Sequence, residues 1–290
     1  MSMDPSEQNP KGQSVRVIVH SFFIIPFLIA VFAVLIFAML KMVVGTPPNL
    51  EQALRTISRG SETERWQAAM DLTAMLQAQR SENIDPRFLD QLSFEFRRSA
   101  TERQPFLRTY LALAMGLTGE PRFETDLIEG LAASDVPSTL ASIKSLGMVG
   151  GAVAEALLVD LLSGDELRIV LESIIALGRL GRTSSIPHLL PFLEHPEANL
   201  RWDSAISLAK LGDRSGREII GRLLERRYYV SFPLVDELEQ DRAILIAVEI
   251  ARLWQESFFK ENLEYLSRND PNLRIADAAL KALKVLNGDE

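Results

Sequence analysis

The chain has 290 residues, 24% of them charged, a net charge of −8 and no cysteine. Without cysteine there is no disulfide, no thiol nucleophile and no cysteine-rich zinc site. Residues 1–44 contain three cations and two carboxylates, so the remainder carries a net charge of −9. The densest basic clusters there are Arg97–Arg98 and Arg226–Arg227, too few for the phosphate contacts that nucleic-acid binding requires.

The N-terminal region consists of a polar tail followed by an apolar segment. Residues 1–14 are polar and are predicted to be disordered. Phe22–Leu40 is a run of 19 residues without a charge, long enough to cross about 30 Å of hydrocarbon as a helix. A cleaved secretory signal would have a shorter apolar core and a small-residue cleavage site, and a helix-pair array would not cover such a segment on all sides. We therefore predict a transmembrane anchor over residues 15–44, with anchor residues Phe22, Phe23, Pro26, Phe27 and Leu40.

The flanking charges do not fix the orientation of this anchor. Two lysine or arginine residues precede the apolar run, and three follow it within about 20 residues. A short tail before a single signal-anchor usually stays in the cytoplasm. We therefore expect a single-pass protein of the plasma (inner) membrane, in a bacterium, with its C-terminal domain on the extracytoplasmic side. The cytoplasmic side remains the alternative.

After the anchor, residues 45–62 are predicted to form a proline-containing spacer and a leading helix, and residues 63–290 form a repeat array. Leu107–Gly119 is an apolar helical string that recurs three times with a period of 31 residues. Small or aliphatic residues recur at the fifth, sixth, eighth and ninth places of each copy, as in an amphipathic helix. The copies end at Gly119, Gly150, Gly181 and Gly212, where we expect the left-handed conformation that glycine adopts at helix ends.

Weaker copies extend the array in both directions, over residues 64–76, 243–255 and 275–287. Two of the steps between copies are about 12 residues longer than the others. Shorter apolar segments between the copies are predicted to be antiparallel partner helices, over residues 87–97, 120–132, 152–162, 184–193, 215–225 and 257–266. Strand signals are absent. The sequence therefore predicts an all-α solenoid of six helix pairs and one closing helix.

The repeat resembles a known type. The pattern Arg-x-x-(Ala/Ser)-Ala-x-x-Leu-(Gly/Ala)-x-Leu-Gly, clearest in Arg201–Gly212, is similar to the short HEAT-like repeat of phycobilisome bilin lyases. The resemblance covers residues 64–287 and implies a HEAT-like α-solenoid. The arginine of the pattern is present at Arg65, Arg108 and Arg201 but is replaced in the other four copies. The resemblance also implies, as one alternative, a lyase-type enzyme or accessory that acts on a chromophore-bearing protein.

No catalytic constellation is visible in the sequence. Phosphate-loop, nucleophile-turn and zinc-helix motifs are absent. His188 and His195 are seven residues apart, and His195 precedes a proline, so we expect surface or capping roles rather than metal binding. The acidic run Asp236–Asp241 is expected to be a solvated face or a helix start. We therefore predict a protein that is not an enzyme and has no catalytic residue, no metal and no cofactor.

Two aromatic stretches at the insertions are the candidate partner-binding residues: Tyr228, Tyr229, Phe232 and Leu234 in one, and Phe94 and Phe96 in the other. Exposed aromatic clusters rimmed by charge are typical of protein-binding surfaces. The alternative is that these aromatic side chains pack inward and seal the core. We expect the second helices of the pairs to line the concave side of the solenoid, where a partner would bind.

These observations lead to one main functional hypothesis. We expect a membrane-anchored scaffold or adaptor that docks a protein partner, such as a membrane transporter or an envelope complex, and binds no nucleic acid. The alternatives are a bilin-lyase-like enzyme or accessory and a protein whose concave groove handles a lipid. The sequence does not identify the partner or the oligomeric state.

Overall fold

The computed structural model describes residues 31–32, 49–78 and 84–288. The chain divides into two compact units, Met1–Gln52 and Ala53–Glu290, and only the second is described over most of its length. The predicted tail and anchor, residues 1–44, therefore lie outside the described residues apart from Val31 and Phe32. Within the described ranges, no helix is both long and apolar enough to cross a membrane.

The described part of the chain is helical and contains no strand. Its first helix, α3, spans Leu50–Arg59. The long helices that carry the repeat are α4 (Glu62–Ala78), α6 (Pro105–Thr118), α8 (Val136–Val149), α10 (Leu167–Leu180), α12 (Ala198–Lys210), α14 (Glu237–Trp254) and α16 (Leu273–Asn287). Their partner helices are α5 (Pro86–Thr101), α7 (Glu124–Gly130), α9 (Ala152–Leu161), α11 (Ile186–Leu189), α13 (Arg217–Leu223) and α15 (Lys260–Asn269). The prediction of an all-helical HEAT-like repeat unit is confirmed.

Short 3-10 turns replace parts of several partner helices. They are η2 (Pro121–Phe123), η3 (Thr183–Ser185), η4 (Leu190–Glu194), η5 (Arg226–Ser231) and η6 (Ser257–Phe259). The segment predicted over residues 184–193 is the most broken, because Pro187 and Pro191 cannot donate the backbone hydrogen bonds of a continuous helix. Proline therefore shortens α11 to four residues.

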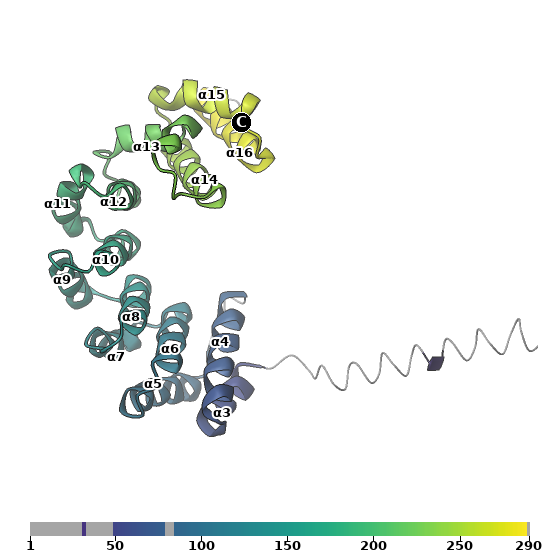
Figure 1. The fold of residues 1–290 in the computed structure, drawn as a ribbon, viewed down its shortest axis with the longest axis vertical. Helices are drawn as coiled ribbons and strands as arrows, with labels where there is room; N and C mark the ends of the chain where they lie inside the picture. The colour runs from purple at the N-terminus through teal and green to yellow at the C-terminus, as the bar shows by residue number, and fades with distance from the viewer. Residues whose placement is uncertain (1–30, 33–48, 79–83, 289–290) are drawn as a thin grey trace, which may run out of the picture. The chain divides into compact units, whose positions relative to one another are not determined.

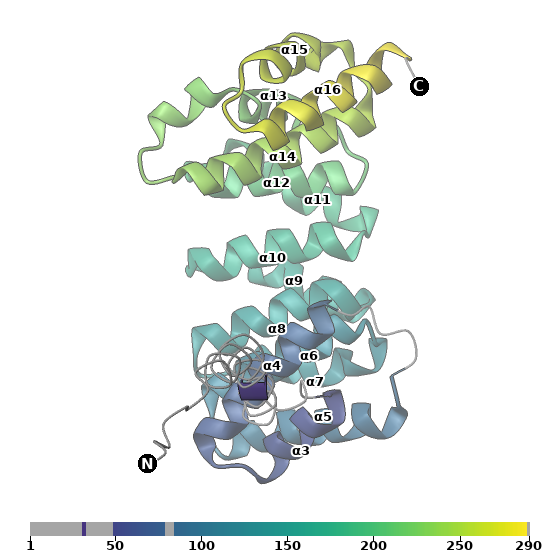
Figure 2. The same ribbon diagram turned by 90° about the vertical axis from the view of Figure 1, so that its right-hand side faces the viewer.

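Within the unit that begins at Ala53, the long helices follow one another along the inner side of an arc, and α5, α7, α9 and α11 lie along its outer side (Figure 1). Figure 2 looks onto the inner side, where α8, α10, α12 and α14 run across the view one above another. We predicted the second helices on the concave side, and this prediction is wrong. The long repeat helices line it instead.

Close packing between successive long helices explains the direction of this curvature. A Cβ atom placed on Gly116 would lie 2.8 Å from the Cα of Ser145 on the next long helix, and one on Gly147 would lie 2.8 Å from the Cα of Ala176. Gly178 repeats this contact against Ser207. Since no side chain intervenes, these helix axes approach closely, and the array bends toward them.

The glycines that end the copies follow the predicted conformation with one exception. Gly119, Gly181 and Gly212 have φ of +72°, +75° and +82°, in the left-handed region. Gly150 has φ −74° and ψ 162°, so the chain leaves α8 in an extended conformation. The reason is a contact from the preceding pair: Glu124 Oε1 accepts hydrogen bonds from the backbone N–H of Gly151 at 2.7 Å and of Ala154 at 3.1 Å. This carboxylate caps the N-terminus of α9, so α9 begins immediately after Gly150 and Gly151.

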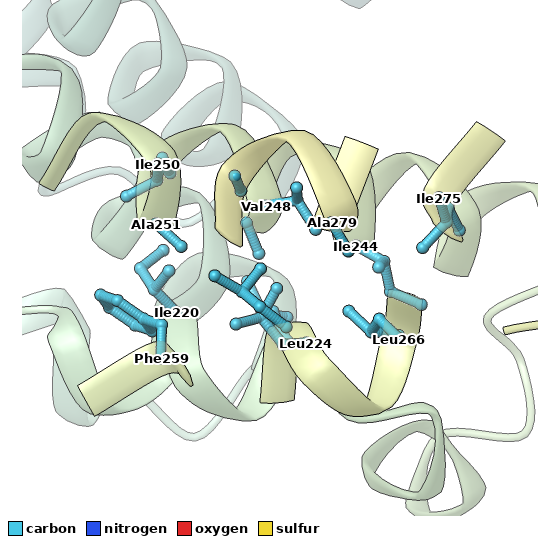
Figure 3. Close-up of a cluster of buried hydrophobic side chains, with 14 of the residues drawn as sticks. Ile220, Leu224, Ile244, Val248, Ile250, Ala251, Phe259, Leu266, Ile275 and Ala279 are labelled. Atoms are coloured by element: carbon cyan, nitrogen blue, oxygen red, sulfur yellow. The ribbon is translucent and has the colours of Figure 1, made fainter. Parts of the chain in front are cut away.

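At the C-terminal end of the array, one continuous apolar core joins α12, α13, α14, α15 and α16. Figure 3 shows side chains from several of these helices meeting in it, among them Ile220, Leu224, Ile244, Val248 and Phe259. The last helix ends at Gly288, with φ +75°, one residue beyond the expected Asn287.

Candidate binding surface

The second insertion, residues 226–235, connects α13 to α14 and is held in place by ion pairs of Arg226, which we call the Arg226 clamp. Its first residue, Arg226, donates hydrogen bonds to Asp241 on α14 at 2.6 Å and to Asp270 before α16 at 2.8 Å. The hydrogen bond to Asp270 is the main cause that raises the pKa of Arg226 above its usual value, and burial opposes it. Asp236 caps α14 by accepting from the backbone N–H of Glu239 at 2.8 Å. The acidic run is thus a helix start and a partner for arginine.

An aromatic cluster lies next to this clamp. Tyr229 is 2% exposed and donates its hydroxyl to the carbonyl oxygen of Leu223 at 3.0 Å. The ring centroids of Trp202, on α12, and Phe232 are 4.9 Å apart in an edge-to-face arrangement, and Trp202 Nε1 donates to the Tyr228 hydroxyl at 3.1 Å. These rings fill the space between the insertion and α12. Of the predicted binding residues here, Tyr229 is inaccessible, and Tyr228 and Phe232 are half-buried.

A groove opens beside the aromatic cluster. It has a volume of about 310 Å³ and lies between the start of α12 and the segment that precedes α14. Its lining residues are Glu197, Ala198, Asn199, Trp202, Ser231, Phe232, Pro233, Leu234 and Val235. Leu234 is 96% exposed at the edge of this groove. The insertion therefore both seals the core and presents an apolar surface.

The first aromatic pair does not form one surface. Phe96 is 1% exposed, and the guanidinium of Arg108 lies over its ring, 5.1 Å from the centroid. Phe94 lies on the same helix, α5, but points to solvent with 56% exposure. The prediction that both bind a partner is therefore wrong for Phe96. The two residues are only two positions apart and lie on different faces of the helix.

A cluster of charged residues on the concave side was not predicted from the sequence. Lys144 on α8, Glu172 and Arg179 on α10, and Asp203 and Lys210 on α12 occupy the fourth, seventh and eleventh places of their copies. At 100° per residue these places lie opposite the buried positions, so the side chains point away from the core. We call these five residues the concave charge cluster. The signal in the sequence that could have revealed this cluster is the presence of charged residues at repeat places outside the apolar stripe.

Members of the concave charge cluster influence one another without forming ion pairs. Burial raises the pKa of Asp203 to about 6, an effect that repulsion from Glu172 reinforces and Lys210 opposes. Burial also lowers the pKa of Lys210, and repulsion from Arg179 adds to this. The one hydrogen bond within the cluster, over the part of the chain that is described, is long: Arg179 Nη1 donates to the Lys144 carbonyl oxygen at 3.5 Å. Burial raises the pKa of Glu172 and outweighs the attraction of Lys144 and Arg179 for its carboxylate.

The same places are partly apolar on α14. The fourth and eleventh places of its copy are Ile246 and Leu253, which are 42% and 63% exposed, whereas the seventh is Glu249, which pairs with Arg252 at 2.6 Å. Leu238, at the start of the same helix, is 59% exposed.

His188 and His195, two of the three histidines of the chain, make surface and local backbone contacts. His188 is exposed on α11, and His195 Nδ1 accepts a hydrogen bond from the backbone N–H of Glu197 at 3.1 Å. Across the residues that the structure describes, no group of three or more histidine, aspartate or glutamate side chains is arranged to hold a metal ion.

Comparison with known proteins supports the fold. No known protein family and no curated protein matches the sequence. The structure is similar to that of the complex of CpcE and CpcF of phycocyanin lyase from Nostoc sp. PCC7120, with 21% identity, a TM-score of 0.56, and 84% of this chain and 96% of that chain covered. Human deoxyhypusine hydroxylase (14% identity, TM-score 0.35, 84% and 86% covered) and an engineered protein (14%, 0.38, 82% and 96%) are more distant. The chain thus has a HEAT-like helical repeat fold.

Proposed function

We propose that the repeat unit is a protein-binding scaffold whose concave side holds a segment of a partner. The concave charge cluster is the observation that carries this proposal. Glu172 and Asp203 are half-buried and form no ion pair with the exposed cations of the cluster, so a bound partner with complementary charges would compensate them. Solenoids present extended concave surfaces of this kind to other proteins.

The chemistry of the surface favours a protein as the partner. The cluster contains three cations and two carboxylates side by side, so it complements a surface of mixed charge better than a uniformly anionic nucleic acid. The net charge of −9 on residues 45–290 would also repel a nucleic acid. The exposed leucine and isoleucine side chains of α14 add an apolar area, as protein interfaces require.

We further propose that Phe22–Leu40 anchors this scaffold in the plasma membrane, with the repeat unit on the extracytoplasmic side. The support is the length and uncharged composition of the segment. A repeat unit held at this side of the membrane would be close to membrane transporters and envelope complexes, so we propose a partner of this kind. The net negative charge of the repeat unit would keep its surface away from anionic lipid headgroups.

Charge reversal on the concave side tests the scaffold proposal. A Lys144→Glu/Lys210→Glu protein should recover about tenfold less partner from detergent-solubilised membranes than the wild type, because two attractive contacts become repulsive. The matched control is Lys260→Glu, an exposed lysine on the outer helix α15, which should recover the partner normally. Equal recovery by the double variant and the control would contradict the proposal.

A lyase-type function is the second candidate. It is supported by the similarity in fold to the phycocyanin lyase complex and by three cations that could pair with the carboxylates of a chromophore. The test is to express the chain with phycocyanin subunits and the free chromophore and to look for a chromophore that stays with the protein on a denaturing gel. Attachment that requires Lys144, Arg179 and Lys210 would favour this candidate, and its absence would leave the scaffold function.

A further inference from the structure

The groove beside the aromatic cluster has room for one large apolar side chain. Its volume of about 310 Å³ is lined by Trp202 and Phe232, whose rings pack edge to face, and by Pro233 and Leu234. Trp202 is itself 7% exposed and is held by its hydrogen bond to Tyr228, so this part of the lining is already formed in the free protein. A preformed apolar wall reduces the ordering cost of binding.

Leu234 is unusual even among the exposed apolar residues of the described chain. At 96% exposure it covers none of the core, although it follows Pro233 in a segment pinned by the Arg226 clamp. Leu238, the second residue of α14, is 59% exposed. Leu234 extends the apolar lining of the groove outward, which would cover the stem of an inserted side chain.

The charge around the groove is strongly negative. The two segments that form it and its surroundings, residues 194–203 and 231–239, contain six carboxylates: Glu194, Glu197, Asp203, Asp236, Glu237 and Glu239. They contain one cation, Arg201, whose guanidinium is already bonded to the carbonyl oxygens of His195 and Pro196 at 2.6 and 2.7 Å. A ligand with positive charge next to its apolar group is therefore favoured.

We propose that this groove binds a basic segment of a partner protein, with one large aliphatic or aromatic side chain placed against Trp202 and Leu234 and with lysine or arginine residues on both sides of it. This inference rests on the proposed protein-binding function, to which it adds the chemistry of the partner. The inserted side chain would bury apolar area in the groove, and the flanking cations would meet Glu197 and the carboxylates before and within the first turn of α14.

The test uses the purified full chain in detergent and three synthetic peptides of equal length. One is Lys-Lys-Leu-Phe-Lys-Lys, the second replaces lysine with glutamate, and the third replaces leucine and phenylalanine with serine. The chain has three tryptophans, so 5-fluorotryptophan labelling gives a fluorine spectrum in which a Trp202→Phe variant identifies the Trp202 signal. We expect the first peptide alone to shift that signal, and to bind at least about tenfold more tightly than the other two.

Two variants link the result to the groove. Leu234→Glu should weaken binding of the basic apolar peptide by about tenfold, because it removes the apolar edge. Leu273→Glu is the matched control, since Leu273 is also strongly exposed, at 82%, but lies on α16, and it should bind normally. Glu197→Lys should reduce the preference for the basic over the acidic peptide.

Several results would overturn the inference. They are equal binding of all three peptides, stronger binding of the acidic peptide, and binding that leaves the Trp202 signal unmoved. A Trp202 shift that depends on protein concentration alone would show a second copy of the chain in the groove and would also reject the proposed occupant. Because peptides replace the partner, a negative result here is distinguishable from failure of the concave charge cluster, which the Lys144 and Lys210 reversals test separately.

Discussion

The close contact between α8 and α10 gives a prediction with a magnitude that follows from the structure. In Gly147→Ala the new Cβ would lie 2.8 Å from the Cα and 3.0 Å from the carbonyl oxygen of Ala176. Both atoms belong to a helix backbone, so no side chain can rotate away, and the two helices must separate. Overpacking of this kind costs about 1 to 3 kcal/mol of unfolding free energy.

Thermal and urea unfolding followed by circular dichroism would measure this cost. For a loss of about 2 kcal/mol in a domain of this size, we expect the midpoint temperature to fall by about 4 to 8 °C. The control is Gly151→Ala, whose added methyl group would meet only the end of the Glu124 side chain at 3.4 Å, an ordinary contact. This control should change stability by less than about 0.5 kcal/mol. Equal midpoints for the two variants would refute the close-packing account of the curvature.

Three further predictions concern other parts of the chain. Tyr229→Ala should lower the free energy of unfolding in urea by about 3 to 5 kcal/mol, because the ring is buried, whereas Leu234→Ala should leave the urea midpoint unchanged. A larger loss from Leu234→Ala than from Tyr229→Ala would contradict the burial of Tyr229 and the exposure of Leu234. Asp203→Asn should raise the midpoint temperature at pH 7.5 but not at pH 4. The pKa of Asp203 in the folded protein, about 6, lies above the ordinary 3.8, so ionisation of Asp203 destabilises the fold progressively as the pH rises between these values, by at most about 3 kcal/mol. Equal effects of the substitution at both pH values would contradict this raised pKa. A cysteine at Ser163, an exposed position after α9, should react with an impermeant maleimide in intact spheroplasts, and labelling only after lysis would place the repeat unit in the cytoplasm.

Much of the fold follows from local patterns in the sequence. The period of 31 residues locates α6, α8, α10 and α12 because each turn of these helices buries the same repeat places. Glycine at the helix end predicts the left-handed residue at Gly119, Gly181 and Gly212. Gly150 differs because Glu124, distant in sequence, caps the following helix. A pattern within one copy carries no information about that contact.

The candidate binding surface was less predictable for a similar reason. Aromatic composition identified the insertion, but whether a ring is buried depends on the neighbouring helices: Tyr229 packs inward, while Leu234 points to solvent. The concave charge cluster is spread over three copies, so no single stretch of sequence displays it. The side on which it lies depends on the curvature, which in turn depends on helix contacts such as that between Gly147 and Ala176.

Photo-crosslinking in living cells would show whether the concave side binds a protein partner. We would place p-benzoylphenylalanine at position 179, in the concave charge cluster, and in a second protein at the exposed position 188 on the outer helix α11. We expect a discrete crosslinked product from position 179, replacing Arg179, and none from position 188, replacing His188. Crosslinks of equal yield from both positions, or from position 188 alone, would contradict this expectation.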